Sequence, residues 1–112
     1  MEESRQPDYP SVLPEELKRR LDAGERVQLL DVREEREFAL ARIEGSNLAP
    51  MSALAQRMPP IDPDTETVVI CHHGVRSAHV VRLLQRAGFD RVSNLEGGLD
   101  AYADVDPEVS RY

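Results

Sequence analysis

The sequence has one cysteine, no tryptophan, few aromatic residues and no long hydrophobic run. A lone cysteine cannot form a disulfide within the chain, and no group of Cys and His residues shows zinc-ligand spacing. A disulfide-linked secreted scaffold and a closed zinc site are therefore not expected. Neither a signal peptide nor a run of about twenty apolar residues is present, which favours a cytoplasmic protein that does not bind membranes.

Acidic residues outnumber basic ones by 21 to 14, which gives a formal net charge of −7. A nucleic-acid surface needs a basic stripe, so no nucleic-acid partner is expected. The 112 residues are enough for one domain. Because 40% of them are hydrophobic but only 4% are aromatic, the core should consist of aliphatic side chains, which suits an α/β protein.

Short apolar runs alternate with helical patterns along the chain. The clearest strand is TVVI at residues 67–70. The clearest helix covers residues 77–87, where one apolar face would carry Val80, Leu83, Leu84 and Ala87. This alternation predicts a parallel sheet covered on both faces. The other expected strands are residues 9–13, 27–31, 43–48 and 91–94, and the other expected helices are residues 14–24, 33–40 (helix or turn), 50–58 and 97–102.

The predicted domain covers residues 9–102. Residues 1–8 are polar and are expected to form a flexible N-terminus. Residues 103–112 are expected to form a polar C-terminal tail on the surface.

The single cysteine, Cys71, follows directly on the TVVI strand and opens the segment CHHGVRSA. Ligands of open parallel sheets bind at the carboxyl ends of the strands. A loop that turns tightly into a helix points backbone N–H groups inward, and Gly74 permits such a turn. Positive potential of this kind stabilises a thiolate, the reactive form of cysteine. Cys71 is thus a candidate nucleophile in an anion cradle, although a buried cysteine can also be a mere packing residue.

Four segments, in order, resemble those of the rhodanese-like sulfurtransferases. They are LLDVREEREF (29–38), ARIEGSNLAP (41–50), CHHGVRSA (71–78) and AGFDRVSNLEGGLDAY (87–102). Two departures are visible: Ala41 and Arg42 stand where the family usually has Gly-His, and Tyr102 stands where it usually has Trp.

The resemblance implies a rhodanese-like open five-stranded parallel sheet with helices on both faces. It also implies a sulfurtransferase in which Cys71 takes a sulfane sulfur from thiosulfate or a persulfide. The Cys71 persulfide then passes this sulfur to cyanide or to a thiol, and either partner can be a small molecule or a protein. No metal or organic cofactor is implied, and a monomer is the default expectation. The residues expected to bind substrate are His72, His73, Gly74, Val75, Arg76 and Ser77.

The roles of three loop side chains stay open at this point. Arg76 would either face the bound anion or brace the loop by pairing with a carboxylate such as Asp31 or Glu96. His72 and His73 would line the pocket or carry a proton.

Two other functions compete with sulfur transfer. A Cys-dependent phosphatase uses a similar cradle, but its loop has one residue more than the four between Cys71 and Arg76. A non-catalytic binding or regulatory module is the other alternative, against which the retained cysteine argues. A dithiol oxidoreductase would need a second cysteine.

Overall fold

The computed structural model describes residues 9–54, 56 and 61–112. The N-terminus expected to be flexible lies outside these residues, as does part of the helix expected at residues 50–58. None of the described helices is long and apolar enough to cross a membrane. The elements are β1 (Ser11–Val12), α1 (Pro14–Asp22), β2 (Gln28–Asp31), α2 (Glu35–Leu40), β3 (Asn47–Leu48), α3 (Met51–Leu54), β4 (Thr67–Ile70), α4 (Val75–Arg86), β5 (Val92–Leu95) and α5 (Gly98–Tyr102).

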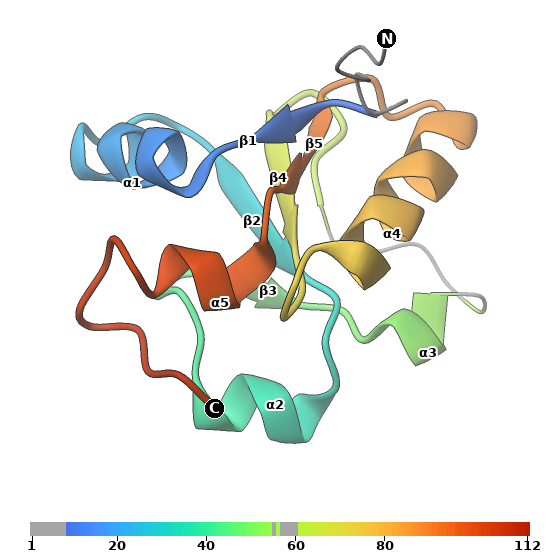
Figure 1. Cartoon of the computed structure of the whole chain (residues 1–112). Helices are drawn as coiled ribbons and strands as arrows, with labels where there is room; N and C mark the ends of the chain where they lie inside the picture. The colour runs from blue at the N-terminus through green and yellow to red at the C-terminus, as the bar shows by residue number, and fades with distance from the viewer. Residues whose placement is uncertain (1–8, 55, 57–60) are drawn as a thin grey trace, which may run out of the picture.

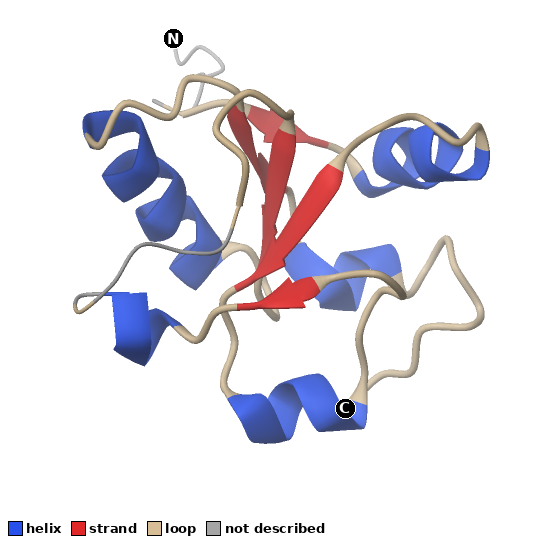
Figure 2. Cartoon of the chain, turned by 180° about the vertical axis from the view of Figure 1, so that it is seen from behind, coloured by secondary structure: helices blue, strands red, loops and turns tan. Residues whose placement is uncertain are grey.

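The five strands form one sheet in the order β1-β5-β4-β2-β3, and every pairing is parallel (Figure 2). The prediction of an open five-stranded parallel sheet is confirmed. β4 is the middle strand, with Val69 in register with Leu30 on β2 and with Asn94 on β5. The carboxyl end of β4 therefore lies between two neighbouring strands rather than at a sheet edge.

Helices cover both faces of the sheet (Figure 1). α1 and α5 lie on one face, α3 and α4 lie on the other, and α2 lies below the carboxyl ends of the strands. β4 alternates between the two cores: Val68 and Ile70 pack under α1 and α5, whereas Val69 and Cys71 pack under α4. This period of two is the pattern of a strand that is buried on both sides, and it places Cys71 on the α4 side.

The helix after the Cys71 loop differs from its prediction in two respects. α4 begins at Val75, two residues earlier than expected, and its buried residues include Ser77, Val80, Val81 and Leu84. These positions follow the spacing of one helix face. Leu83 is 40% exposed and Ala87 is exposed as well, although both were expected on the buried face. The face of α4 that packs on the sheet carries Val80, Val81 and Leu84 instead.

Most of the tail at residues 103–112 is exposed or partly exposed, but one of its residues belongs to the core. Val109 is only 7% exposed and joins the cluster under α1 and α5, together with Tyr102. Val105 is partly buried against the same cluster. The two valines are four residues apart in a largely polar tail. The sequence analysis did not use this spacing to predict that they are buried.

The two adjacent leucines of α4 offer a test of this packing. We expect Leu84→Ala to lower the free energy of unfolding by about 2–4 kcal/mol, because Leu84 is 4% exposed and its loss leaves a cavity. We expect Leu83→Ala to cost less than about 1 kcal/mol, because Leu83 already contacts solvent. Urea unfolding of both variants measures the difference. Equal losses would contradict the orientation of α4.

Candidate active site

The Cys71 sulfur lies at the carboxyl end of β4 and is held by backbone donors. Cys71 is 1% exposed. Its Sγ accepts hydrogen bonds from the backbone N–H groups of Gly74, at 3.1 Å, and Ser77, at 3.3 Å. Ser77 lies in the first turn of α4, whose N-terminal end carries a partial positive charge. Two of the expected backbone donors among residues 72–77 thus contact the sulfur, which makes the loop a cradle for an anion.

Gly74 is the residue that lets the loop turn into α4. Its φ of +93° lies in the left-handed region that favours glycine. A Cβ at this position would lie 3.2 Å from the backbone nitrogen of Gly97 and 3.3 Å from the carbonyl oxygen of Leu95. Both the dihedral angle and the close approach of β5 therefore favour glycine here.

The start of α5 fixes the other side of the loop. The backbone N–H of Leu99 donates to the carbonyl of Cys71 at 2.8 Å, and that of Asp100 donates to the carbonyl of His72 at 3.0 Å. Gly98 makes this contact possible, because a Cβ there would lie only 2.4 Å from the His72 carbonyl oxygen. Gly98, the first residue of α5, thus lets the helix approach the loop that carries the thiol.

A buried polar pair adjoins the sulfur. The Ser77 hydroxyl oxygen is 3.3 Å from Cys71 Sγ and 2.5 Å from Asn94 Oδ1. The Asn94 Nδ2 group donates to the Gly74 carbonyl at 3.1 Å. Ser77 and Asn94 are 0% and 2% exposed. Sequence reasoning missed Asn94, although a polar residue inside a predicted strand was a usable signal.

Arg76 braces the loop through a carboxylate that the sequence interpretation did not name. Its guanidinium donates to both oxygens of Glu37, at 2.8 and 3.0 Å, rather than pairing with Asp31 or Glu96. The pair lowers the pKa of Glu37 to about 2, mainly through the hydrogen bonds from Arg76. The same bonds raise the pKa of Arg76, which stays cationic. Nothing in the sequence singles out Glu37 from its acidic neighbours.

A second ion pair is buried beneath the end of β2. Arg33 and Asp31 are both 0% exposed, and two guanidinium nitrogens of Arg33 donate to the Asp31 carboxylate at 2.9 and 2.7 Å. Burial lowers the pKa of Arg33, but the bonds to Asp31 and Tyr112 outweigh burial and raise it overall. Arg33 also donates to the Ala41 carbonyl and to the Tyr112 hydroxyl. The two residues thus tie the end of β2 to Ala41 and Tyr112.

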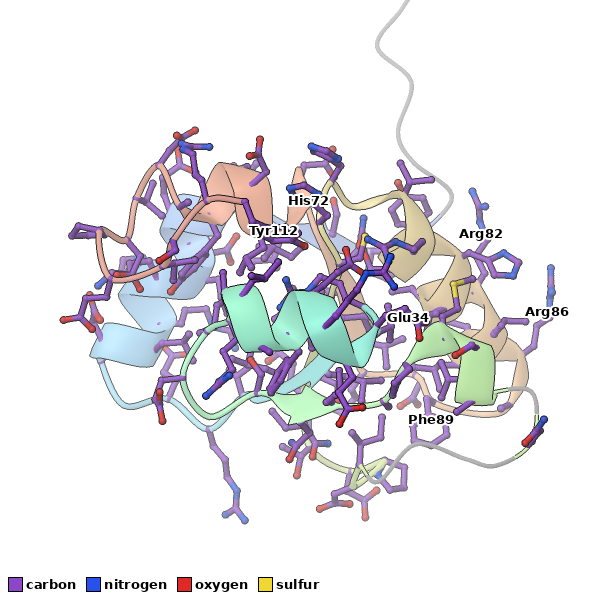
Figure 3. The ribbon with its side chains drawn as sticks, turned by 90° about the horizontal axis from the view of Figure 1, so that it is seen from below. Glu34, His72, Arg82, Arg86, Phe89 and Tyr112 are labelled. Carbon is purple, nitrogen blue, oxygen red and sulfur yellow. The ribbon has the colours of Figure 1, made fainter. Side chains whose placement is uncertain are left out.

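The two loop histidines lie at the rim of the site. The His72 ring stacks between His73, at 4.0 Å, and Tyr112, at 4.2 Å between centroids. Figure 3 shows His72 and Tyr112 side by side. Burial, reinforced by His73, lowers the pKa of His72, so its ring is neutral at pH 7. His73 is exposed, and Val75 is 76% exposed and lies outside the cradle.

One group of potential metal ligands lies at this rim. A ligand atom from each of His72, His73 and Asp100 falls within 4.8 Å of the others. The Asp100 carboxylate already accepts a hydrogen bond from Arg111 at 3.1 Å. The cluster does not include the Cys71 sulfur.

A cavity opens on the β5 side of the loop. Its volume is about 320 Å³, and its lining includes the buried Asn94. The other lining residues are Tyr9, His73, Gly74, Val75, Ala78, Arg82, Glu96 and Gly97. The cavity therefore adjoins the peptide that donates to the sulfur, and it offers space for a reactant beside the loop.

The arrangement of a cysteine after the middle strand, a short glycine loop and a helix start is matched by a known family. The family model of the rhodanese-like domain matches residues 13–104. The chain belongs to the rhodanese-like family. Of the three residues that depart from the family pattern, Ala41 and Tyr102 are buried in the core, at 8% and 1% exposed, whereas Arg42 is exposed.

Curated relatives of this rhodanese-like chain include proteins named as sulfurtransferases. The putative sulfurtransferase YtwF of Bacillus subtilis is 38% identical over 86 residues, which is 77% of this chain and 82% of that protein. The probable adenylyltransferase/sulfurtransferase MoeZ of Mycobacterium tuberculosis is 32% identical over 91% of this chain. This chain spans only 27% of MoeZ, and similarly small parts of several other relatives.

Solved structures show the same fold. A rhodanese-related protein from Thermoplasma volcanium superposes with a TM-score of 0.80 and 30% sequence identity. The match covers 93% of this chain and the whole of that one. The rhodanese-like fold thus extends over nearly all of both chains.

The ion pair between Glu37 and Arg76 predicts a pH-dependent contribution to stability. Because the folded-state pKa of Glu37 is about 2 and its ordinary value is 4.5, this contribution is present above about pH 5 and is lost as the pH falls towards 2. We expect Glu37→Gln to lower the free energy of unfolding by about 1–2 kcal/mol at pH 7, since Arg76 is partly screened by solvent.

Urea unfolding between pH 7 and pH 3 measures this contribution. The difference between the wild type and Glu37→Gln should shrink as the pH falls. Glu35→Gln, which neutralises an exposed carboxylate on the same helix, is the matched control and should change stability little. A difference for Glu37→Gln that stays constant down to pH 3 would contradict the assignment.

Gly98→Ala should distort the loop that carries the thiol. The new Cβ would clash with the backbone of Cys71 and His72. We therefore expect the free energy of unfolding to fall by about 3 kcal/mol or more, and the rate of Cys71 alkylation to change. Gly24→Ala is the control, because Gly24 has a similar φ of +77° with nothing within 4 Å. Gly24→Ala should lower the free energy of unfolding by about 1 kcal/mol and leave the rate of Cys71 alkylation unchanged. Equal effects of the two substitutions would argue against the crowded contact.

Proposed function

We propose that this chain is a sulfurtransferase that works through a persulfide on Cys71. The observation that carries the proposal is the pair of backbone N–H groups, from Gly74 and Ser77, that point at Cys71 Sγ. Such fixed dipoles stabilise a thiolate before the reaction and the negative charge that develops during it. The names of several relatives support the same reaction class.

The proposed reaction has two displacement steps. The Cys71 thiolate attacks the terminal sulfur of thiosulfate, and the S–S bond of the donor breaks with its electron pair leaving on sulfite. With a persulfide donor, the leaving group is a thiolate instead. Cyanide or a thiol then attacks the outer sulfur of the Cys71 persulfide. The new S–S bond breaks, its electron pair returns to Cys71, and thiocyanate or a new persulfide departs.

The geometry favours sulfur over phosphate as the transferred group. Cys71 is almost completely covered, and the loop reaches α4 at Val75 after only three residues. A single terminal sulfur atom is smaller than a tetrahedral phosphate. In a phosphatase, moreover, an arginine closes the cradle over the phosphate, whereas here Arg76 is bound at both ends of its guanidinium to Glu37.

The charges around the loop bear on the choice of donor. Arg33 and Arg76 are paired with carboxylates, and His72 is neutral at pH 7. Arg82 lines the adjoining cavity, but the net charge of −7 opposes long-range attraction of a dianion such as thiosulfate. We therefore expect a persulfide donor of lower charge to load Cys71 faster than thiosulfate does.

Intact-protein mass spectrometry tests the proposed function. After brief incubation with thiosulfate, and separately with a low-molecular-weight persulfide, we expect the protein to gain the mass of one sulfur atom. Cyanide should remove this sulfur and release thiocyanate. Cys71→Ser should show no gain, because a hydroxyl does not form a persulfide under these conditions. His79→Asn, a change at an exposed position of α4, is the control and should load as the wild type does.

Alkylation with iodoacetamide distinguishes the two ways in which this experiment can fail. If Cys71 reacts with iodoacetamide but neither donor adds sulfur, the protein is a binding module rather than a sulfurtransferase. If Cys71 resists iodoacetamide as well, the cysteine is a packing residue. Either result overturns the proposal.

A further inference from the structure

The buried Ser77 hydroxyl has two acceptors and only one proton. Its oxygen lies 2.5 Å from Asn94 Oδ1 and 3.3 Å from Cys71 Sγ. A hydroxyl donates one hydrogen bond at a time, so the two contacts cannot both be donated simultaneously. The acceptor that receives the proton depends on the charge of the sulfur, because a neutral sulfur is a weak acceptor and a thiolate is a strong one.

We propose that Asn94 is a positioning residue that sets the reactivity of Cys71 by competing for the Ser77 proton. While the sulfur is a neutral thiol, Ser77 donates to the amide oxygen of Asn94. The Ser77 oxygen then presents a lone pair to the sulfur and can accept the S–H proton. When Cys71 loses its proton to solvent, the Ser77 hydroxyl turns to the thiolate, and Asn94 Oδ1 loses the donor that it has among the described residues.

Asn94 is held firmly enough to act in this way. It lies on β5, its residue is 2% exposed, and its Nδ2 group is fixed by the Gly74 carbonyl at 3.1 Å. The backbone N–H of Asn94 donates to the Pro10 carbonyl at 2.9 Å, which fixes β5 against the chain before β1. A buried acceptor without a donor is unfavourable, so forming the thiolate carries an opposing cost at Asn94.

The competition gives Asn94 a place in the reaction cycle, a consequence that rests on the proposed function. In the persulfide the inner Cys71 sulfur is bonded to two atoms and is neutral, so the Ser77 proton can return to Asn94. Asn94 Oδ1 therefore accepts a hydrogen bond from Ser77 in the thiol and persulfide states, and lacks that bond in the thiolate state. Asn94 would thus favour loading of sulfur over retention of a free thiolate.

The pH dependence of Cys71 alkylation tests this inference without any sulfur transfer. Cys71 is the only cysteine, so iodoacetamide reports on it alone. We expect Asn94→Leu to move the midpoint of the rate profile to lower pH by about one unit, because the Ser77 proton then has only the sulfur as acceptor. The limiting rate at high pH should stay within about twofold of the wild type.

A double-mutant cycle separates this effect from a loss of structure. In a Ser77→Ala background, Asn94→Leu should leave the midpoint unchanged, because no proton remains to compete for. A midpoint that does not fall in the single variant, or one that falls equally in the Ser77→Ala background, would overturn the proposal. If Asn94→Leu does not fold, Asn94→Thr is the substitute, since threonine suits a strand and is too short to reach Ser77. The cycle stays interpretable even if no sulfur donor loads Cys71.

Discussion

The hydrogen bonds between the start of α5 and the backbone of residues 71 and 72 are the constraint on which the site depends. They direct the two carbonyls towards α5, and the loop must then turn within two residues to enter α4. This turn requires the left-handed Gly74, and the approach of α5 requires Gly98. With both conditions met, the N–H of Gly74, which precedes α4, and that of Ser77, in its first turn, point at Cys71 Sγ.

The electrostatic character of the site follows from this backbone geometry rather than from charged side chains. Asp31 neutralises Arg33, and Glu37 neutralises Arg76. At the sulfur itself the positive potential comes from the peptide dipoles of Gly74 and Ser77, which do not titrate. The arginines have a mechanical role instead: Arg76 links α4 to α2, and Arg33 links the end of β2 to Ala41 and Tyr112.

The parts of the fold that local patterns determine were predictable from the sequence. The β-branched run before Cys71, the alternation of strands and helices and the position of Gly74 led to the right sheet and the right loop. The long-range partners were not predictable, because nothing in the LLDVREEREF segment distinguishes Glu37 from its acidic neighbours. The exposure of Leu83 and the burial of Val109 were missed for a similar reason: each depends on which neighbouring element covers it.

A cradle made of backbone leaves its side chains available for other tasks. His73 and Val75 are exposed, and His72 forms part of a ring stack at the rim, so none of the three is needed to hold the sulfur. Ser77 and Asn94 differ, because they are buried and lie between the sulfur and the next strand. In the proposed reaction the exposed side chains would be free to select the reactant, while the proposed competition between Ser77 and Asn94 would adjust the sulfur itself. These two properties could change separately, since one set of side chains is exposed and the other is buried.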